Sequence, residues 1–132
     1  MINPDGTGAR KLATGTLHVG EPSWSPNGRL IAFSAVKSNC DPLTASHGCD
    51  AIFVVNENGT GLRRLTPYWA FNSVPAWSPD GTQIAFAGKQ LDDNGNDEGS
   101  IYLMAANGTQ RHLLLRQPKP WVTQPLVWQH SP

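Results

Sequence analysis

Two cysteines that are close together in the sequence offer the clearest chemistry of this chain. Cys40 and Cys49 are its only cysteines, nine positions apart, and they enclose a polar segment. A disulfide between them is the favoured interpretation, because a cross-link reduces the conformational freedom of a long loop. Such a bond would indicate an oxidising compartment, either the periplasm or the cell exterior.

Two alternatives stay open for this pair. Both cysteines could be free thiols, or Cys40, His47 and Cys49 could bind zinc with Asp41 or Asp50 as a fourth ligand. Zinc accepts mixed sulfur, nitrogen and carboxylate ligands. Zinc sites usually carry a second paired Cys or His motif, however, and this sequence has none.

The segment 92–99 is rich in carboxylate and amide side chains, which are the ligands that calcium prefers. It does not match an EF-hand loop, because Asp97 stands at the sixth position, where that loop needs Gly. A solvated hairpin loop is the favoured interpretation, calcium binding is the alternative, and no other cofactor is expected. The candidate calcium ligands are Asp92, Asn94, Asn96 and Glu98.

Composition and motifs exclude several classes of function. Lys plus Arg and Asp plus Glu each number 10 in 132 residues, and this zero net charge argues against nucleic-acid binding. No apolar run reaches the roughly 18 residues of a membrane span, so membrane insertion is not expected. The chain also lacks a Gly-x-Ser-x-Gly elbow, a His-Glu-x-x-His motif and a phosphate-binding Gly loop. We therefore expect a protein without catalytic activity of its own.

The elements that position these residues are repeated along the chain. The segment 22–33 (PSWSPNGRLIAF) recurs as 75–86 (PAWSPDGTQIAF), so Trp77 follows Trp24 after 53 residues (77 − 24). The same unit begins again at Pro125, with Trp128. A second unit with an Asn-Gly-Thr or Asp-Gly-Thr turn occurs three times, with its glycine at Gly6, Gly59 and Gly108. Repeats of roughly 50 residues are typical of propellers and solenoids.

Each repeat is expected to form four short strands joined by tight turns. Pro presets the first dihedral angle of a turn, and Gly accepts the positive φ that closes a hairpin. The expected strands are 21–25, 29–35, 51–56 and 62–66, then 74–78, 83–88, 100–105 and 110–115. The expected turn residues are Pro26, Gly28, Gly59, Pro79, Asp80, Gly81 and Gly108. Asn58 and Asn107 also match the glycosylation pattern, but the recurring hairpin explains them better.

The predicted fold class is all-β, a partial β-propeller made of four-stranded antiparallel blades. Trp24 and Trp77 are expected to lie between neighbouring blades, and the alternative is core tryptophans in an unrelated sandwich. The expected organisation is the end of one blade (1–19), two full blades (20–66 and 67–116) and the start of another (117–132). Because propellers close with roughly four to eight blades, we expect a fragment of a larger ring or a protomer that completes a ring by self-association.

Basic side chains collect on the predicted fourth strands. In a propeller these are outer edge strands, where charge prevents unwanted strand pairing. A stripe that binds an anionic partner is the alternative. The residues are Arg10, Lys11, Arg63, Arg64, Arg111 and His112.

These repeats resemble a known pattern. The segments 77–86 (WSPDGTQIAF), 101–104 (IYLM) and 107–109 (NGT), with 62–66 (LRRLT) as an outermost strand, resemble the WD-repeat-like propeller of the TolB family. The resemblance implies a non-catalytic scaffold for protein–protein interaction in the periplasm or outside the cell. The same repeat also occurs in prolyl-oligopeptidase-like serine peptidases, so a propeller domain of such an enzyme is the alternative. Three segments are expected to contact a partner: 38–49, 67–71 and 92–99.

Overall fold

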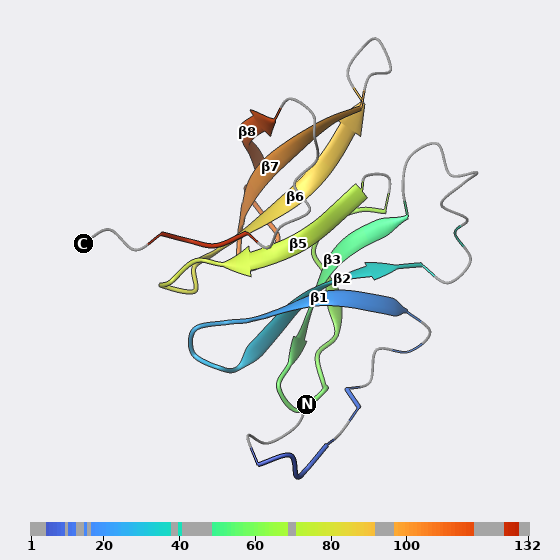
Figure 1. Cartoon of the computed structure of the whole chain (residues 1–132), viewed down its shortest axis with the longest axis vertical. Helices are drawn as coiled ribbons and strands as arrows, with labels where there is room; N and C mark the ends of the chain where they lie inside the picture. Colours follow the sequence, from blue (N-terminus) through green and yellow to red (C-terminus); the bar gives the residue numbers. More distant parts are fainter. Residues whose placement is uncertain are drawn as a thin grey trace.

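The computed structural model describes residues 5–9, 11–12, 15, 17–37, 40, 49–68, 71–91, 97–117 and 126–129. These residues form two four-stranded antiparallel sheets, with strand orders β1-β2-β3-β4 and β5-β6-β7-β8, that lie side by side (Figure 1). No helix among the described residues could cross a membrane. The strands are β1 (His18–Trp24), β2 (Leu30–Val36), β3 (Asp50–Asn56), β4 (Arg63–Arg64), β5 (Phe71–Trp77), β6 (Gln83–Leu91), β7 (Asp97–Ala105) and β8 (His112–Gln117).

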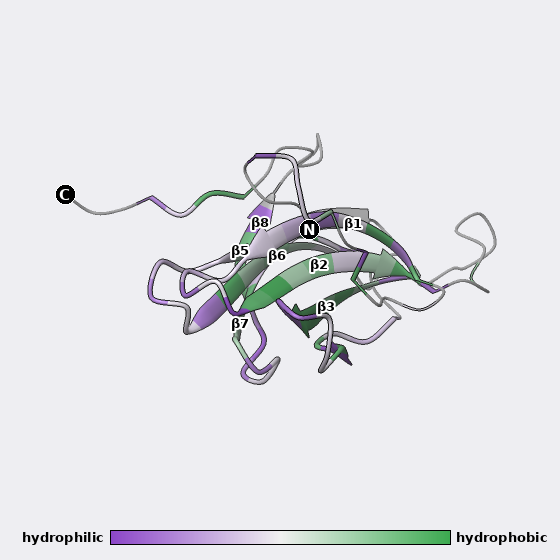
Figure 2. Cartoon of the chain, turned by 90° about the horizontal axis from the view of Figure 1, so that it is seen from below, coloured by the Kyte–Doolittle hydropathy of each residue, from purple (hydrophilic) through white to green (hydrophobic). Residues whose placement is uncertain are grey.

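The middle strands of the first sheet are buried on both faces. In β2, the five consecutive residues 31–35 are buried, and in β3 the residues 51–55 are buried as well. A continuous apolar run, rather than an alternating one, marks a sheet that is covered on both sides. In Figure 2, the hydrophobic colour accordingly falls on β2 and β3, whereas the tight turns are largely hydrophilic.

The first strand of each sheet has a bulge at the same position. The register of β1 with β2 shifts between Gly20 and Ser23, and that of β5 with β6 shifts between Ser73 and Ala76. Within these bulges, Glu21 (φ 53°) and Val74 (φ 51°) adopt the left-handed conformation, which is costly for residues other than Gly. The repeat of sequence is therefore also a repeat of backbone geometry.

The two sheets share one hydrophobic core. Ala32, Ile52 and Val54 of the first sheet meet Ile84, Phe86 and Met104 of the second, and Trp77 packs among them. The turn at Gly108 contacts the first sheet closely, because an added Cβ there would lie 3.1 Å from the carbonyl oxygen of Leu65. These contacts make the sheets two adjacent blades of a partial β-propeller, as the sequence predicts.

The far side of the first sheet carries a second core. Phe33 and Phe53 stack there with their ring centroids 5.7 Å apart, and each side chain is at most 5% exposed. Leu12 and Leu17, which precede β1, pack against this cluster together with Tyr68. Described residues of the segment before β1 therefore contact this side of the sheet.

Several strand limits differ from the expected ones. β1 starts at His18 rather than 21, and β5 starts at Phe71 rather than 74, because pairing continues beyond each bulge. The ladder of β6 with β7 continues to Leu91 and Asp97, so part of the predicted loop 92–99 is strand. β4 has only two residues, because the hydroxyl of Thr66 accepts the hydrogen bond from the backbone N–H of Ile52 (2.8 Å). The limits assigned to the blades remain predictions.

Candidate functional site

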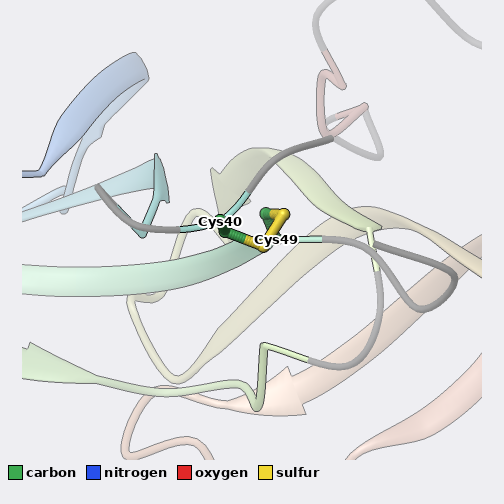
Figure 3. Close-up of a disulfide and its surroundings, with 2 residues drawn as sticks. All are labelled: Cys40 and Cys49. Atoms are coloured by element: carbon green, nitrogen blue, oxygen red, sulfur yellow. A yellow bond between two sulfur atoms is a disulfide. The ribbon is translucent and has the colours of Figure 1, made fainter. Parts of the chain in front are cut away.

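The cysteine pair forms a disulfide. Cys40 and Cys49 are bonded with their Cα atoms 5.7 Å apart, at the base of the connection between β2 and β3 (Figure 3). Lys37 contributes two backbone hydrogen bonds: its N–H donates to the carbonyl of Cys49 (3.3 Å), and its carbonyl accepts from the N–H of Cys40 (3.0 Å). The favoured prediction is confirmed, and neither cysteine is a free thiol or a zinc thiolate in this oxidised form.

The calcium candidates stay a prediction. Asp92, Asn94 and Asn96 lie outside the described residues, and the backbone of Glu98 is part of β7. His47 and Asp41 of the alternative zinc set also lie outside them. Among the residues that the structure describes, no group of three or more His, Cys, Asp or Glu side chains could hold a metal ion.

The long connections leave the two sheets at the same end. β2 and β6 are equivalent strands, and their arrowheads point to the same side of the molecule (right in Figure 1). The connections from Val36 to Asp50 and from Leu91 to Asp97 therefore start and finish at one end, where β5 also begins. The Pro-x-Gly turns lie at the opposite end. The topology thus brings together the ends of all three segments expected to contact a partner.

A cationic and aromatic cluster lies near this end of the first sheet. The guanidinium carbon of Arg64 is 4.5 Å from the ring centroid of Tyr68, and Lys37 Nζ is 6.0 Å from it. The half-buried Tyr68 ring also meets Phe53, at 6.2 Å between centroids. This contact anchors two exposed cations to the core. The sequence places Tyr68 in a segment expected to contact a partner and Arg64 on an edge strand, but nothing in their spacing predicts the contact.

Two carboxylates occupy the interface between the sheets. Glu21 Oε2 accepts hydrogen bonds from the backbone N–H of Val74 (2.7 Å) and from the hydroxyl of Ser34 (2.9 Å). Partial burial, followed by repulsion from Glu21, raises the pKa of Asp50 above its ordinary value. The sequence does not predict the role of either carboxylate. Val74 stands in the second repeat where Glu21 stands in the first, so this carboxylate is not part of the repeated pattern.

The shared geometry of the Pro-x-Gly turns depends on one side-chain oxygen in each blade. Asp80 Oδ1 accepts hydrogen bonds from the Ser78 hydroxyl (2.6 Å) and from the backbone N–H of Thr82 (3.0 Å). These bonds lower the pKa of Asp80. In the first blade, Asn27 Oδ1 makes the equivalent bond with Ser25 (2.8 Å). The turn residues predicted from sequence therefore form matching turns.

The tryptophans of the repeat have different surroundings. Trp77 is 7% exposed, and its indole donates a hydrogen bond to the carbonyl of Ser23 in the first blade (3.1 Å). The indole of Trp128 donates in the same way to the carbonyl of Ala76 in the second blade (3.1 Å). Trp24 is 47% exposed, and no described residue accepts a bond from its indole. Trp77 is the expected wedge between blades, whereas Trp24 lies on a flank without a described blade beside it.

Comparison with known proteins agrees with this geometry. A segment of 87 residues is 36% identical to the Tol-Pal system protein TolB of several Francisella tularensis strains, and it covers 65% of this chain and 17% of the relative. Solved structures include a putative TolB from Agrobacterium tumefaciens (TM-score 0.68, 20% identity), with 87% of this chain and 39% of that chain covered. The two sheets are TolB-like propeller blades. TolB from Acinetobacter baumannii superimposes with a TM-score of 0.64 and 20% identity, covering 85% of this chain and 25% of that chain.

The similarity to TolB has limits. The chain spans less than a fifth of the length of the Francisella relatives, and no family model matches it. The likeness to the two solved TolB structures concerns the fold. A further relative, the uncharacterized peptidase YuxL of Bacillus subtilis, is 30% identical over 89 residues, which cover 62% of this chain and 12% of that protein. The fold alone does not assign a function.

Proposed function

We propose that this chain is a non-catalytic, protein-binding part of a TolB-like propeller. The partner binds at the end of the blades from which the long connections leave. The observation that supports this most is that strand topology brings the ends of three variable segments to one end, beside the Arg64–Tyr68 cluster. Loops held on a rigid sheet scaffold are common binding surfaces. The TolB relatives are named as components of a Tol-Pal system, so proteins of such a system are the proposed partners.

Binding to purified Tol-Pal proteins tests this proposal. Isothermal calorimetry should detect a complex, and the substitution Arg64→Ala should weaken it roughly two- to fivefold, the range expected when one exposed charged side chain is lost from a binding surface. Arg63→Ala is the matched control, because Arg63 is an equally exposed neighbour on β4 that makes no contact with Tyr68. Absence of binding to every Tol-Pal protein would contradict the proposal, as would equal effects of the two substitutions.

The similarity to YuxL favours a second candidate, the propeller of a prolyl-oligopeptidase-like serine peptidase. In that case, the natural gene product would carry a nucleophilic serine in a separate catalytic domain. A fluorophosphonate probe, which labels activated serines, would label that natural product. Labelling would favour the peptidase, whereas an unlabelled product that binds Tol-Pal proteins would favour the scaffold.

The proposed location is the periplasm or the cell exterior. The Cys40–Cys49 disulfide supports it, because structural disulfides persist in oxidising compartments. Self-association to complete a ring also remains a prediction. Sedimentation velocity over a range of concentrations tests it, since ring closure would produce a defined larger species and a constant monomer would contradict it.

A further inference from the structure

Two cations share one aromatic ring where the long connections leave the first blade. The guanidinium carbon of Arg64 lies 4.5 Å from the ring centroid of Tyr68, and Lys37 Nζ lies 6.0 Å from it. The two charged groups are therefore no further apart than the sum of these distances. Tyr68 packs against Phe53 and the second core, so the ring that holds the cations is itself anchored. Two like charges held near each other attract an anion to the space that they share.

The described part of the chain supplies no anion for this pair. No carboxylate there forms an ion pair with Lys37 or Arg64, both of which are exposed. A candidate would be Asp50, whose backbone pairs with Val36, the residue before Lys37. Burial and Glu21 raise the pKa of Asp50, however, whereas a neighbouring cation would lower it. Within the described residues, both cations are therefore open to a carboxylate from outside.

A neighbouring blade does not close the position of Arg64. Arg64 pairs with Phe53 in the first sheet. The equivalent pair of the second sheet is Leu113 with Tyr102. Tyr102 packs against the core that the two blades share, so Leu113 is on the face turned toward the first blade. Leu113 is nevertheless 40% exposed with that blade in place. The outermost strand of a blade therefore stays accessible beside its neighbour, and a blade before β1 would leave Arg64 accessible in the same way.

We propose that Lys37 and Arg64, held on the ring of Tyr68, bind an acidic side chain of the protein partner. This inference rests on the proposed function, since it assigns a chemical class to the partner segment that docks at this end of the blades. The aspartate or glutamate carboxylate of that segment accepts hydrogen bonds from the guanidinium group and is attracted by the ammonium group as well. Because the ring already limits the freedom of both long side chains, binding costs less conformational entropy than at unsupported cations.

Arg63 provides a matched control, because it adjoins Arg64 but faces the other way. Its backbone pairs with Val54, which lies in the core shared by the two blades, so the side chains of Arg63 and Arg64 are on opposite faces. Arg63 is also exposed, and no ring among the described residues lies under its guanidinium group. Substitution of Arg63 therefore removes one positive charge from the same strand and leaves the proposed site intact.

A capped pentaglutamate peptide is the probe, and capped pentaglutamine is its uncharged counterpart. Acetyl and amide caps leave only side-chain carboxylates, so a peptide C-terminus cannot be the ligand. Each peptide is titrated into the ¹⁵N-labelled chain at low salt, and the backbone amide signals of Lys37, Arg64 and Tyr68 are followed by NMR. The proposal predicts saturable shifts with the glutamate peptide and none with the glutamine peptide. The shifts should disappear in about 1 M salt, which screens exposed charges.

Substitutions then locate the binding. Lys37→Gln and Arg64→Gln should each raise the dissociation constant roughly two- to fivefold, the range expected for exposed ion pairs. Arg63→Gln should have a smaller effect than either. Tyr68→Leu removes no charge but releases both cations from the ring, so it should also weaken binding, by about twofold or more. Retained melting temperatures confirm that each variant folds.

Several results would overturn the proposal. One is the absence of a saturable shift up to about 20 mM pentaglutamate, which is weaker than useful recognition. Equal effects of Arg63→Gln and Arg64→Gln, or unchanged binding by the Tyr68→Leu variant, would reduce the site to a diffuse positive charge. Asp41 follows Cys40 and lies outside the described residues. Binding that appears only after Asp41→Asn would show that the chain's own carboxylate occupies the cations.

These outcomes are distinct from those of the proposed function. A chain that binds Tol-Pal proteins but not pentaglutamate would keep the proposed function and lose this inference. A chain that binds pentaglutamate at this site but no Tol-Pal protein would keep the carboxylate site and lose the proposed partners.

Discussion

Asp80 and Asn27 hold equivalent turns with the same side-chain atom but differ in charge. Each Oδ1 accepts a hydrogen bond from the serine two residues earlier, and each also accepts one from the backbone N–H two residues later. An amide is therefore sufficient for the turn. The hydrogen bonds to Asp80 lower its pKa, so the carboxylate alone makes the second turn sensitive to acid.

We predict that Asp80→Asn reduces the loss of stability in acid. Because the pKa of Asp80 is lowered in the folded chain, its contribution is present above the unfolded pKa of about 3.9 and is lost as the pH falls through the lowered value. Melting temperatures between about pH 2 and pH 6 should fall less steeply for the variant. The reverse change, Asn27→Asp, should add acid sensitivity, and parallel profiles for all three proteins would refute this account.

The pKa of Asp50 is shifted in the opposite direction to that of Asp80. Its pKa is raised by burial and by Glu21, so its favourable contribution is present below the unfolded pKa and is lost as the pH rises through the raised value. At neutral pH, Asp50→Asn should therefore stabilise the fold modestly, because the amide removes the partly buried charge and its repulsion from Glu21, while solvent screens part of the effect. Urea unfolding measures the change. Asp5→Asn is the control and should give no gain, since the pKa of Asp5 is lowered. A less stable Asp50→Asn variant would contradict the prediction.

At the scale of the elements, the two equivalent tryptophans of the repeat contribute differently to the stability of the fold. Trp77 is buried between the sheets, whereas Trp24 is half exposed. We predict that Trp77→Ala lowers the free energy of unfolding by about 3–5 kcal/mol, because it leaves a cavity in the core. Trp24→Ala should cost less than about 1 kcal/mol in the isolated chain. Chemical denaturation compares the two, and equal losses would mean that the sheets do not pack around Trp77.

The disulfide fixes the base of the β2–β3 connection. The denatured chain should show no reactive thiol before reduction, and the thiols of both cysteines should react after reduction. Replacing Cys40 and Cys49 by Ser should lower stability by about 2–3 kcal/mol, as expected for a short closed loop. The reduced natural chain is the control, because it should match the variant. Free thiols in the unreduced protein would show that the bond does not form.

The repeated parts of the elements could be predicted from the sequence, and the unique parts could not. Trp-Ser-Pro and Asn-Gly turns at fixed spacing predict the strands and the blades, because turn chemistry and periodicity are local. The β6–β7 ladder to Asp97 was missed, since its polar residues suggest a loop and pairing alone extends the strand. The contacts of Arg64 with Tyr68 and of Glu21 with Val74 were also missed, because they join residues that only tertiary packing brings together.

At the scale of the whole molecule, each blade covers one face of the next. The shared core contains side chains from both sheets, and Trp77 lies between them. Stacked repeats gain most of their stability from such interfaces, since a single blade buries little apolar surface. The exposed side chains Val19, Trp24, Leu113, Leu114, Leu115 and Val127 mark the outer surfaces of this two-blade unit and the segment beside it.

The packing of the two blades around Trp77 is tested most directly by NMR distance contacts. The indole protons of Trp77 should show nuclear Overhauser contacts to methyl groups of Ala32 and Val54 in the first sheet, as well as to Ile84 in its own sheet. Contacts confined to residues of the second sheet would show that the blades are not packed side by side, and would contradict the propeller account.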